Sequence, residues 1–220
     1  MTEIKICGIT NLEDAKIAAL AGANALGFIF HPGSPRHVTP ERAKGITSLL
    51  PVSICKVGVF VDCDAGEVKR ISRFCKLDLI QLHGSESPDY CRRFPPSVLL
   101  KAVALRSEED LAVLNEYPVK AIVADARDSG LPGGTGRTCD WNLAKRAGEK
   151  CTLVLAGGLN SGNIRAAIES VRPCAVDIAS GAEARPGKKD SEKIKEIIMA
   201  VKGFELAGTP VPADRIFQRI

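Results

Sequence analysis

The first apolar segment of the chain ends in a cysteine whose neighbour suits acid–base chemistry. The segment Glu3–Cys7 alternates so that Lys5 and Cys7 project to the same side of an extended strand. An ammonium group beside a thiol lowers the pKa of the thiol and increases the fraction of thiolate, the form that abstracts protons or attacks carbon. We therefore predict that Cys7 is a catalytic base or nucleophile with a lowered pKa. A buried structural cysteine is the alternative interpretation.

A second group able to move protons, Asp125, ends the apolar run Val119–Asp125. An ordinary aspartate has a pKa of about 3.9, so Asp125 can act as a general acid at neutral pH only if burial or a nearby anion raises that pKa. The segment that follows is rich in glycine and is predicted to be a flexible loop over the site, with its centre at Gly133, Gly134, Thr135 and Gly136. A carboxylate that only caps this loop is the alternative.

Two further pairs, Gly157-Gly158 and Ser180-Gly181, close successive apolar runs. Parallel α/β barrels often build phosphate sites there, from backbone N–H groups and the N-terminus of a short helix. Either pair alone would be a weak signal, because glycine is common in tight turns. Together they predict a phosphate-binding site formed by Gly157, Gly158, Ser180 and Gly181.

Three more polar residues follow strand-like runs and are candidates for substrate binding. Arg36 follows Pro32 and Pro35, two prolines that restrict the backbone of its loop, so its guanidinium could be aimed at a planar carboxylate. Gln81 and His83 lie two residues apart at the end of another run, so their side chains point to the same side and could orient substrate hydroxyl groups. A solvated loop arginine and a structural histidine are the alternatives.

These residues must be positioned by a repeating set of elements. Short runs rich in apolar residues recur at intervals of about 20 to 30 residues, which leaves room for one helix after each. The predicted strands are Glu3–Cys7, Ala25–Phe30, Ser53–Phe60, Leu77–His83, Leu99–Leu105, Val119–Asp125, Cys151–Gly157 and Ala175–Ser180. Near-continuous apolar strands that alternate with helices are typical of a parallel sheet that is covered on its outer face.

The segments between the strands carry helical signals. Asn11 is placed to cap a first helix that Gly22 ends. Further helices are predicted at Pro40–Leu50, Asp64–Cys75, Ser87–Phe94, Ser107–Glu116, Asp140–Gly148, Ser161–Ser170 and Asp190–Lys202. Eight such units favour a single (β/α)8 TIM barrel, with an open doubly wound sheet as the alternative. Either architecture places the active site at the carboxyl ends of the strands.

The barrel is predicted to occupy residues 1–203 of the 220, as one domain. Residues 204–220 are then a C-terminal extension that covers the barrel bottom or contacts another subunit, and not a separate domain.

Composition narrows the class of partner. The 30 basic and 26 acidic residues are scattered, giving a net charge of +4 without the basic stripe of a nucleic-acid-binding protein. No apolar run reaches the roughly 18 residues of a membrane span. The eight cysteines contain no C-x-x-C pair, so we expect no metal site and no disulfide framework. A cytoplasmic monomer or homodimer acting on a small phosphorylated molecule is expected.

Five motifs at successive strand ends resemble the phosphoribosylanthranilate isomerase family of tryptophan biosynthesis. They are Lys5-Ile6-Cys7-Gly8, Ser34-Pro35-Arg36, Gln81-Leu82-His83-Gly84, Gly133-Gly134-Thr135-Gly136 with Asp140-Trp141, and Ala156-Gly157-Gly158-Leu159. The resemblance spans residues 3 to 202. One departure is Ala179, which stands where the family usually has a serine in Asp177–Glu183, and removes one hydroxyl group from the predicted phosphate site.

This resemblance implies an Amadori rearrangement of N-(5-phosphoribosyl)anthranilate to 1-(2-carboxyphenylamino)-1-deoxyribulose 5-phosphate without a cofactor. It gives Asp125 the role of acid at the ring oxygen and Cys7 the role of base at C2. It gives Arg36 the anthranilate carboxylate and the glycine pairs the phosphate. Asp177 is a further substrate-binding candidate.

Two other functions remain open on the residues alone. Another phosphosugar isomerase or an epimerase would share the barrel, but a typical epimerase needs metal ligands that are not evident at the strand ends. A noncatalytic phosphate-binding barrel would explain the glycine pairs but not a cysteine and an aspartate at two strand ends.

Overall fold

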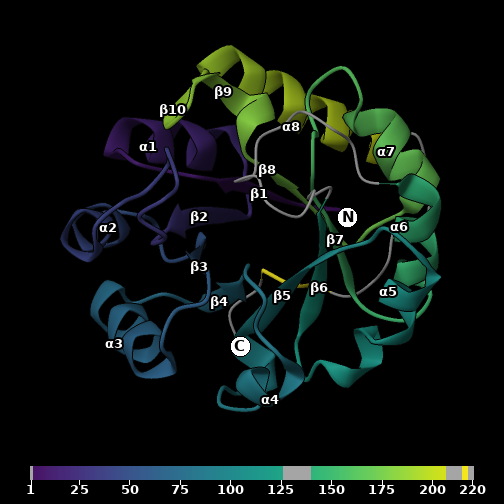
Figure 1. Cartoon of the computed structure of the whole chain (residues 1–220). Helices are drawn as coiled ribbons and strands as arrows, with labels where there is room; N and C mark the ends of the chain where they lie inside the picture. The colour runs from purple at the N-terminus through teal and green to yellow at the C-terminus, as the bar shows by residue number, and fades with distance from the viewer. Residues whose placement is uncertain (1, 126–139, 207–214, 218–220) are drawn as a thin grey trace.

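A closed barrel of parallel strands forms the centre of the molecule (Figure 1). The computed structural model describes residues 2–125, 140–206 and 215–217. The strands follow chain order around the barrel and are β1 (Glu3–Cys7), β2 (Ala25–Ile29), β3 (Cys55–Phe60), β4 (Leu79–Leu82), β5 (Leu99–Ala104), β6 (Ala121–Asp125), β7 (Leu153–Leu155) and β8 (Ala175–Ile178). Strand β1 pairs with both β2 and β8, which closes the sheet and confirms the predicted (β/α)8 barrel.

Helices surround this barrel on the outside (Figure 1). They are α1 (Leu12–Ala21), α2 (Pro40–Thr47), α3 (Ala65–Cys75), α4 (Pro88–Cys91), α5 (Glu108–Ala112), α6 (Trp141–Gly148), α7 (Ile164–Val171) and α8 (Ser191–Leu206), with short 3-10 turns η1 (Pro96–Val98), η2 (Leu114–Glu116) and η3 (Ser180–Ala182). The Asn11 side chain accepts the N–H of Asp14, and Gly22 ends α1 with a φ of 110°. Both predicted ends of the first helix are confirmed.

Two helices have only about half their predicted length, and one hairpin was missed. The predicted helix Ser87–Phe94 is reduced to α4. Phe94 directly precedes Pro95, and a residue before a proline disfavours helical geometry, so the helix does not extend to Phe94. The predicted helix Ser107–Glu116 divides into α5 and η2. The hairpin consists of β9 (Glu183–Arg185) and β10 (Lys188–Lys189), whose polar, very short strands carry no apolar periodicity.

Alternation along the strands separates two apolar layers. Side chains such as Val57, Leu100 and Val123 fill the barrel interior, whereas Ile6 and Phe28 pack between the strands and the outer helices. On the inward faces, the residues at the carboxyl ends of several strands are polar instead of apolar. The candidate site therefore lies at that end of the barrel.

The opposite end of the barrel interior is met by part of the C-terminal extension. Ile216 and Phe217 are buried in the interior apolar cluster. Their backbone N–H groups donate to Oε2 of Glu3, at 2.5 and 3.0 Å. Because Glu3 begins β1, this contact lies at the amino ends of the strands. Helix α8 continues to Leu206, beyond its predicted end at Lys202.

Candidate active site

Strands β1 and β8 bring Lys5, Cys7 and Asp177 together on one wall of the barrel. Lys5 lies opposite Asp177 in the parallel register, and its Nζ is 2.7 Å from Oδ2 of Asp177, with both side chains buried. On the neighbouring strand β2, a Cβ at Gly27 would lie 2.7 Å from Sγ of Cys7 and 3.1 Å from Nζ of Lys5. A glycine at this position therefore makes room for the thiol and the ammonium group beside each other.

The ionisation of Cys7 differs from the sequence prediction. Burial raises the pKa of the Cys7 thiol, and the charge of Lys5 only partly opposes that increase. Asp177 pushes the pKa in the same direction as burial, because it is an anion close to the thiol. The prediction that Lys5 lowers the pKa of Cys7 below its ordinary value is therefore wrong, since desolvation and the carboxylate paired with Lys5 outweigh the ammonium charge.

Strands β4 and β6 form the wall that carries the candidate acid. Oδ2 of Asp125 is 2.9 Å from Nε2 of His83, and Nδ1 of His83 is 2.8 Å from Nε2 of Gln81. Because the Gln81 amide nitrogen is a donor, Nδ1 accepts and the ring proton resides on Nε2, where it is donated to Asp125. Gln81 thereby sets the tautomer of His83, and His83 orients the carboxyl group.

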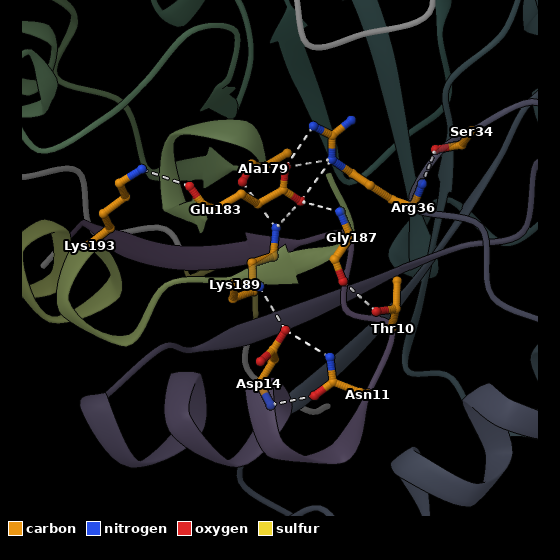
Figure 2. Close-up of polar contacts among 10 residues, drawn as sticks. All are labelled: Thr10, Asn11, Asp14, Ser34, Arg36, Ala179, Glu183, Gly187, Lys189 and Lys193. Atoms are coloured by element: carbon orange, nitrogen blue, oxygen red, sulfur yellow. Dashed lines mark hydrogen bonds and ion pairs between the residues drawn. The ribbon is translucent and has the colours of Figure 1, made fainter. Parts of the chain in front are cut away.

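Arg36 reaches the same end of the barrel from the loop after β2. It is 6% exposed, so it is not a solvated loop arginine. Its Nε and Nη2 donate to the carboxylate of Glu183, with Nη2 2.8 Å from Oε2, while Nζ of Lys189 lies 2.9 Å from Oε1 (Figure 2). Sequence analysis missed Glu183 and Lys189, because 147 residues separate Glu183 from Arg36 along the chain.

The two glycine-containing pairs lie in adjacent loops. A Cβ at Gly181 would overlap the carbonyl oxygen of Leu159, so the loops after β7 and β8 pack backbone to backbone. Gly157 and Gly158 have φ angles of 82° and 63°, which glycine adopts without strain. Within the described residues, no hydrogen bond is donated by the backbone N–H groups of these two glycines or of Ser180 and Gly181. These backbone N–H groups are therefore available as donors in the described part of the structure.

Strand order places Cys7 and Asp177 opposite Gln81 and His83. In a closed ring of eight strands, β4 is four positions from β8 and β5 is four positions from β1. The wall with Cys7 and Asp177 therefore faces the wall with Gln81 and His83, and Asp125 lies at the edge of the latter. The predicted flexible loop at 133–136 lies outside the described residues.

The described part of the chain contains no group of three or more His, Cys, Asp or Glu side chains arranged to hold a metal ion. None of its helices is long and apolar enough to cross a membrane.

Comparison with known proteins identifies the family. A family model described as PRAI, N-(5'phosphoribosyl)anthranilate (PRA) isomerase, matches residues 4–200. An N-(5'-phosphoribosyl)anthranilate isomerase from Syntrophus aciditrophicus (strain SB) is 52% identical over 205 residues, covering 93% of this chain and 89% of the relative.

Two solved structures agree with this assignment. The crystal structure of a phosphoribosyl anthranilate isomerase in complex with reduced 1-(o-carboxyphenylamino)-1-deoxyribulose 5-phosphate is 41% identical, with a TM-score of 0.83, and covers 92% of this chain and 100% of that chain. A structure of monomers generated from the dimeric isomerase of Thermotoga maritima is 40% identical, with a TM-score of 0.83 and the same coverage. The chain belongs to the N-(5'-phosphoribosyl)anthranilate isomerase family.

Proposed function

We propose that Cys7 and Asp125 carry out the two proton transfers by which this enzyme converts N-(5'-phosphoribosyl)anthranilate to 1-(o-carboxyphenylamino)-1-deoxyribulose 5-phosphate. The observation that carries the proposal is the placement of these groups at the carboxyl ends of β1 and β6, three strands apart around one closed barrel. Each has a neighbour that suits its task, with Lys5 beside Cys7 and His83 bonded to Asp125.

In the first step, the carboxyl group of Asp125 donates its proton to the ring oxygen of the ribose. The bond between C1 and the ring oxygen breaks with its electron pair going to that oxygen, and the lone pair of the anthranilate nitrogen forms a C=N bond. The product is an open-chain iminium ion. The hydrogen bond from His83 holds the carboxyl group in one orientation, so that the proton meets the ring oxygen.

In the second step, the thiolate of Cys7 takes the proton from C2. The C–H electron pair forms the C1=C2 bond while the C=N electrons return to nitrogen, which gives an enolamine. Protonation of C1 and loss of the hydroxyl proton at C2 then produce the ketone. Burial raises the pKa of Cys7, and the ammonium of Lys5 offsets part of that increase, while the iminium charge acidifies C2. Two general acid–base steps are therefore sufficient, each contributing about 10²- to 10⁴-fold.

Substrate binding follows from the hydrogen-bonding capacity that the site retains. Oε1 of Gln81 and Oδ1 of Asp177 are buried acceptors without a hydrogen-bond partner in the described part of the structure. Buried acceptors of this kind gain most from a donor brought by a ligand, and the hydroxyl groups of the opened ribose are such donors. Arg36 would bind the anthranilate carboxylate, and the backbone donors at Gly157, Gly158, Ser180 and Gly181 would bind the phosphate.

The rearrangement is an isomerisation without net change of oxidation state, so the proposed chemistry needs neither a metal nor a redox cofactor. We place the enzyme in the cytoplasm, where small biosynthetic intermediates are processed, as a monomer or a homodimer. Sedimentation of the purified full chain would distinguish the two states.

The reaction itself is tested with freshly generated phosphoribosylanthranilate. Addition of the purified protein should remove the anthranilate-type fluorescence, and a chelator in the assay should leave the rate unchanged. Retained fluorescence would contradict the proposed reaction, and a rate abolished by the chelator would contradict the metal-free mechanism.

A further inference from the structure

The path of the Arg36 side chain is fixed along its length. The backbone N–H of Arg36 donates to Oγ of Ser34 at 3.1 Å, which sets the start of the path. Gly8, with a φ of 79°, lies against the aliphatic part, because a Cβ at this position would be 2.7 Å from Cδ of Arg36. The guanidinium therefore arrives at one place beside the end of β1.

A single carboxylate then fixes how the guanidinium is turned. Nε of Arg36 lies 2.9 and 3.1 Å from the two oxygens of Glu183, and Nη2 lies 2.8 Å from Oε2. One edge of the guanidinium is thereby filled, since such paired hydrogen bonds hold both groups in a common plane. Figure 2 shows that Nη1 points away from Glu183, and Nη1 donates no hydrogen bond to a described residue.

The carboxylate is itself held by the hairpin β9–β10 and by helix α1. Oδ2 of Asp14 accepts the backbone N–H of Lys189 at 2.7 Å, and Oδ1 lies 2.6 Å from Nζ of Lys188. The hydroxyl of Thr10 donates to the carbonyl of Gly187 at 2.6 Å (Figure 2). These contacts attach the hairpin to the segment that follows Cys7, so the positions of the guanidinium and the thiol are linked through one rigid unit.

The charges in this cluster do not cancel. Nζ of Lys189 is 2.9 Å from Oε1 of Glu183 and is almost fully buried. Although burial alone would raise it, the contacts with Arg36 and Lys189 hold the pKa of Glu183 below its ordinary value, so the group is ionised at neutral pH. Burial lowers the pKa of Lys189, and the carboxylate of Glu183, in contact with its ammonium group, opposes that decrease. With Arg36 and Lys189 both protonated, two cations and one anion leave one positive charge, while the nearby pair of Lys5 and Asp177 is neutral. A buried excess charge of this sign calls for an anionic ligand.

We propose that the hairpin β9–β10 determines the enzyme's selectivity for a carboxylate on the aromatic ring of its substrate. Glu183 orients Arg36 so that its Nη1 edge meets the ligand, and Lys189 prevents Glu183 from neutralising Arg36. Both are positioning residues, and the inference rests on the proposed function, in which Arg36 binds that carboxylate.

The test compares two ligands that differ only in this group. One is reduced 1-(o-carboxyphenylamino)-1-deoxyribulose 5-phosphate, and the other is the same compound without the carboxyl group. Their dissociation constants are measured by calorimetry on the full chain. Because a charge-assisted hydrogen bond contributes about 1.5–3 kcal/mol, the unmodified protein should prefer the carboxylated ligand by at least about tenfold.

Glu183→Gln and Lys189→Met should each reduce this preference by about tenfold, with little change in affinity for the ligand that lacks the carboxyl group. In turnover, the same variants should raise KM much more than they lower kcat. Lys189→Arg keeps the charge and should restore most of the preference. The matched control is Lys193→Met, since Nζ of Lys193 donates to the backbone carbonyl of Glu183, at 2.7 Å, and not to the Glu183 carboxylate.

Binding of the ligand without the carboxyl group reports whether each variant is folded. If Glu183→Gln fails this control, Lys189→Met and Lys189→Arg decide the question. An unchanged preference in folded variants would overturn the role of the hairpin, and so would an equal loss in Lys193→Met. A wild-type protein that binds neither ligand would instead contradict the proposed function.

Discussion

The two ends of the barrel interior differ in whether their buried polar side chains have hydrogen-bond partners. At the carboxyl end, Gln81 and Asp177 each keep a buried oxygen that no described residue satisfies. At the amino end, the inward carboxylate of Glu3 accepts two backbone N–H groups from Ile216 and Phe217. Both ends bury polar side chains at positions that apolar side chains usually occupy in a barrel. The described residues provide partners for the carboxylate of Glu3 but leave one oxygen each of Gln81 and Asp177 without a partner.

This difference distinguishes polar groups that stabilise the fold from polar groups that are available to a ligand. A buried polar group with partners from its own chain stabilises one conformation, whereas one without them is costly until a ligand arrives. The carboxyl end therefore has the properties of a binding site and the amino end those of a closed surface. Changes at the first should affect chemistry and binding, and changes at the second should affect stability alone.

The largest effects are expected for the two proton-transfer groups. Cys7→Ser and Asp125→Asn should each reduce turnover at least about 10²-fold, because each removes one acid–base step. Binding of the reduced product analogue should be largely retained in both variants. Steady-state kinetics and calorimetry measure the two quantities. Cys63→Ser, at a partly buried thiol outside the site, is the control, and full activity of either main variant would reject the assigned roles.

At the amino end, Phe217→Ala should lower the free energy of unfolding by up to about 3 kcal/mol, because it leaves a cavity in the interior cluster. The value of kcat should stay the same, since Phe217 lies at the amino end of the barrel and the site lies at the carboxyl end. Chemical denaturation and kinetics test the pair of expectations. Met199→Ala removes an exposed apolar side chain from α8 and should change neither property. A loss of kcat in Phe217→Ala would show that the two ends are coupled.

Cys55, a buried thiol at the amino end, allows the comparison between the two ends to be tested through the pH dependence of stability. Burial raises the pKa of Cys55 to about 12. A thiol whose folded pKa lies above its unfolded value adds stability that is fully present below the unfolded pKa and is lost as the pH rises toward the folded pKa. From pH about 9.5 upward, unfolding of the wild type should become easier by about 1.4 kcal/mol per pH unit relative to Cys55→Ala.

The comparison with Cys55→Ala cancels the other titrating groups, which both proteins share. Addition of the reduced product analogue should leave this slope difference unchanged, since the ligand binds at the other end of the barrel. Parallel curves for the two proteins up to high pH would show that Cys55 is solvated in the folded state.

Local pattern was sufficient for most of the barrel. Apolar runs about six residues long, separated by capped helices, predicted the eight strands and the end of the barrel at which Cys7 and Asp125 lie. The hairpin β9–β10 was not predicted, because its strands, which contain Glu183, Arg185 and Lys188, show no alternation of apolar and polar residues. Its strands are held by ion pairs with distant residues, which a single sequence does not reveal.

The chemistry of the site was predicted less completely than its location. The types of Lys5 and Cys7 are visible in the sequence, but the depth of their burial and the pairing of Lys5 with Asp177 are products of barrel closure. For that reason the sequence predicted a lowered pKa for Cys7, whereas the pKa is raised in the folded protein. The loop with Arg36 predicted an aimed guanidinium without indicating that Glu183 would orient it.

The smallest expected effect concerns the carboxylate at the amino end. Glu3→Gln keeps one acceptor oxygen but loses the charge that strengthens the bonds from Ile216 and Phe217, so the free energy of unfolding should fall by about 1 kcal/mol. In a chain that ends at residue 203, these donors are absent and water can reach Glu3, so the same substitution should have almost no effect. A double-mutant cycle on the four proteins measures the coupling directly. Equal costs in the long and short chains would mean that the tail does not satisfy Glu3, and the contrast between the two ends would then rest on apolar packing alone.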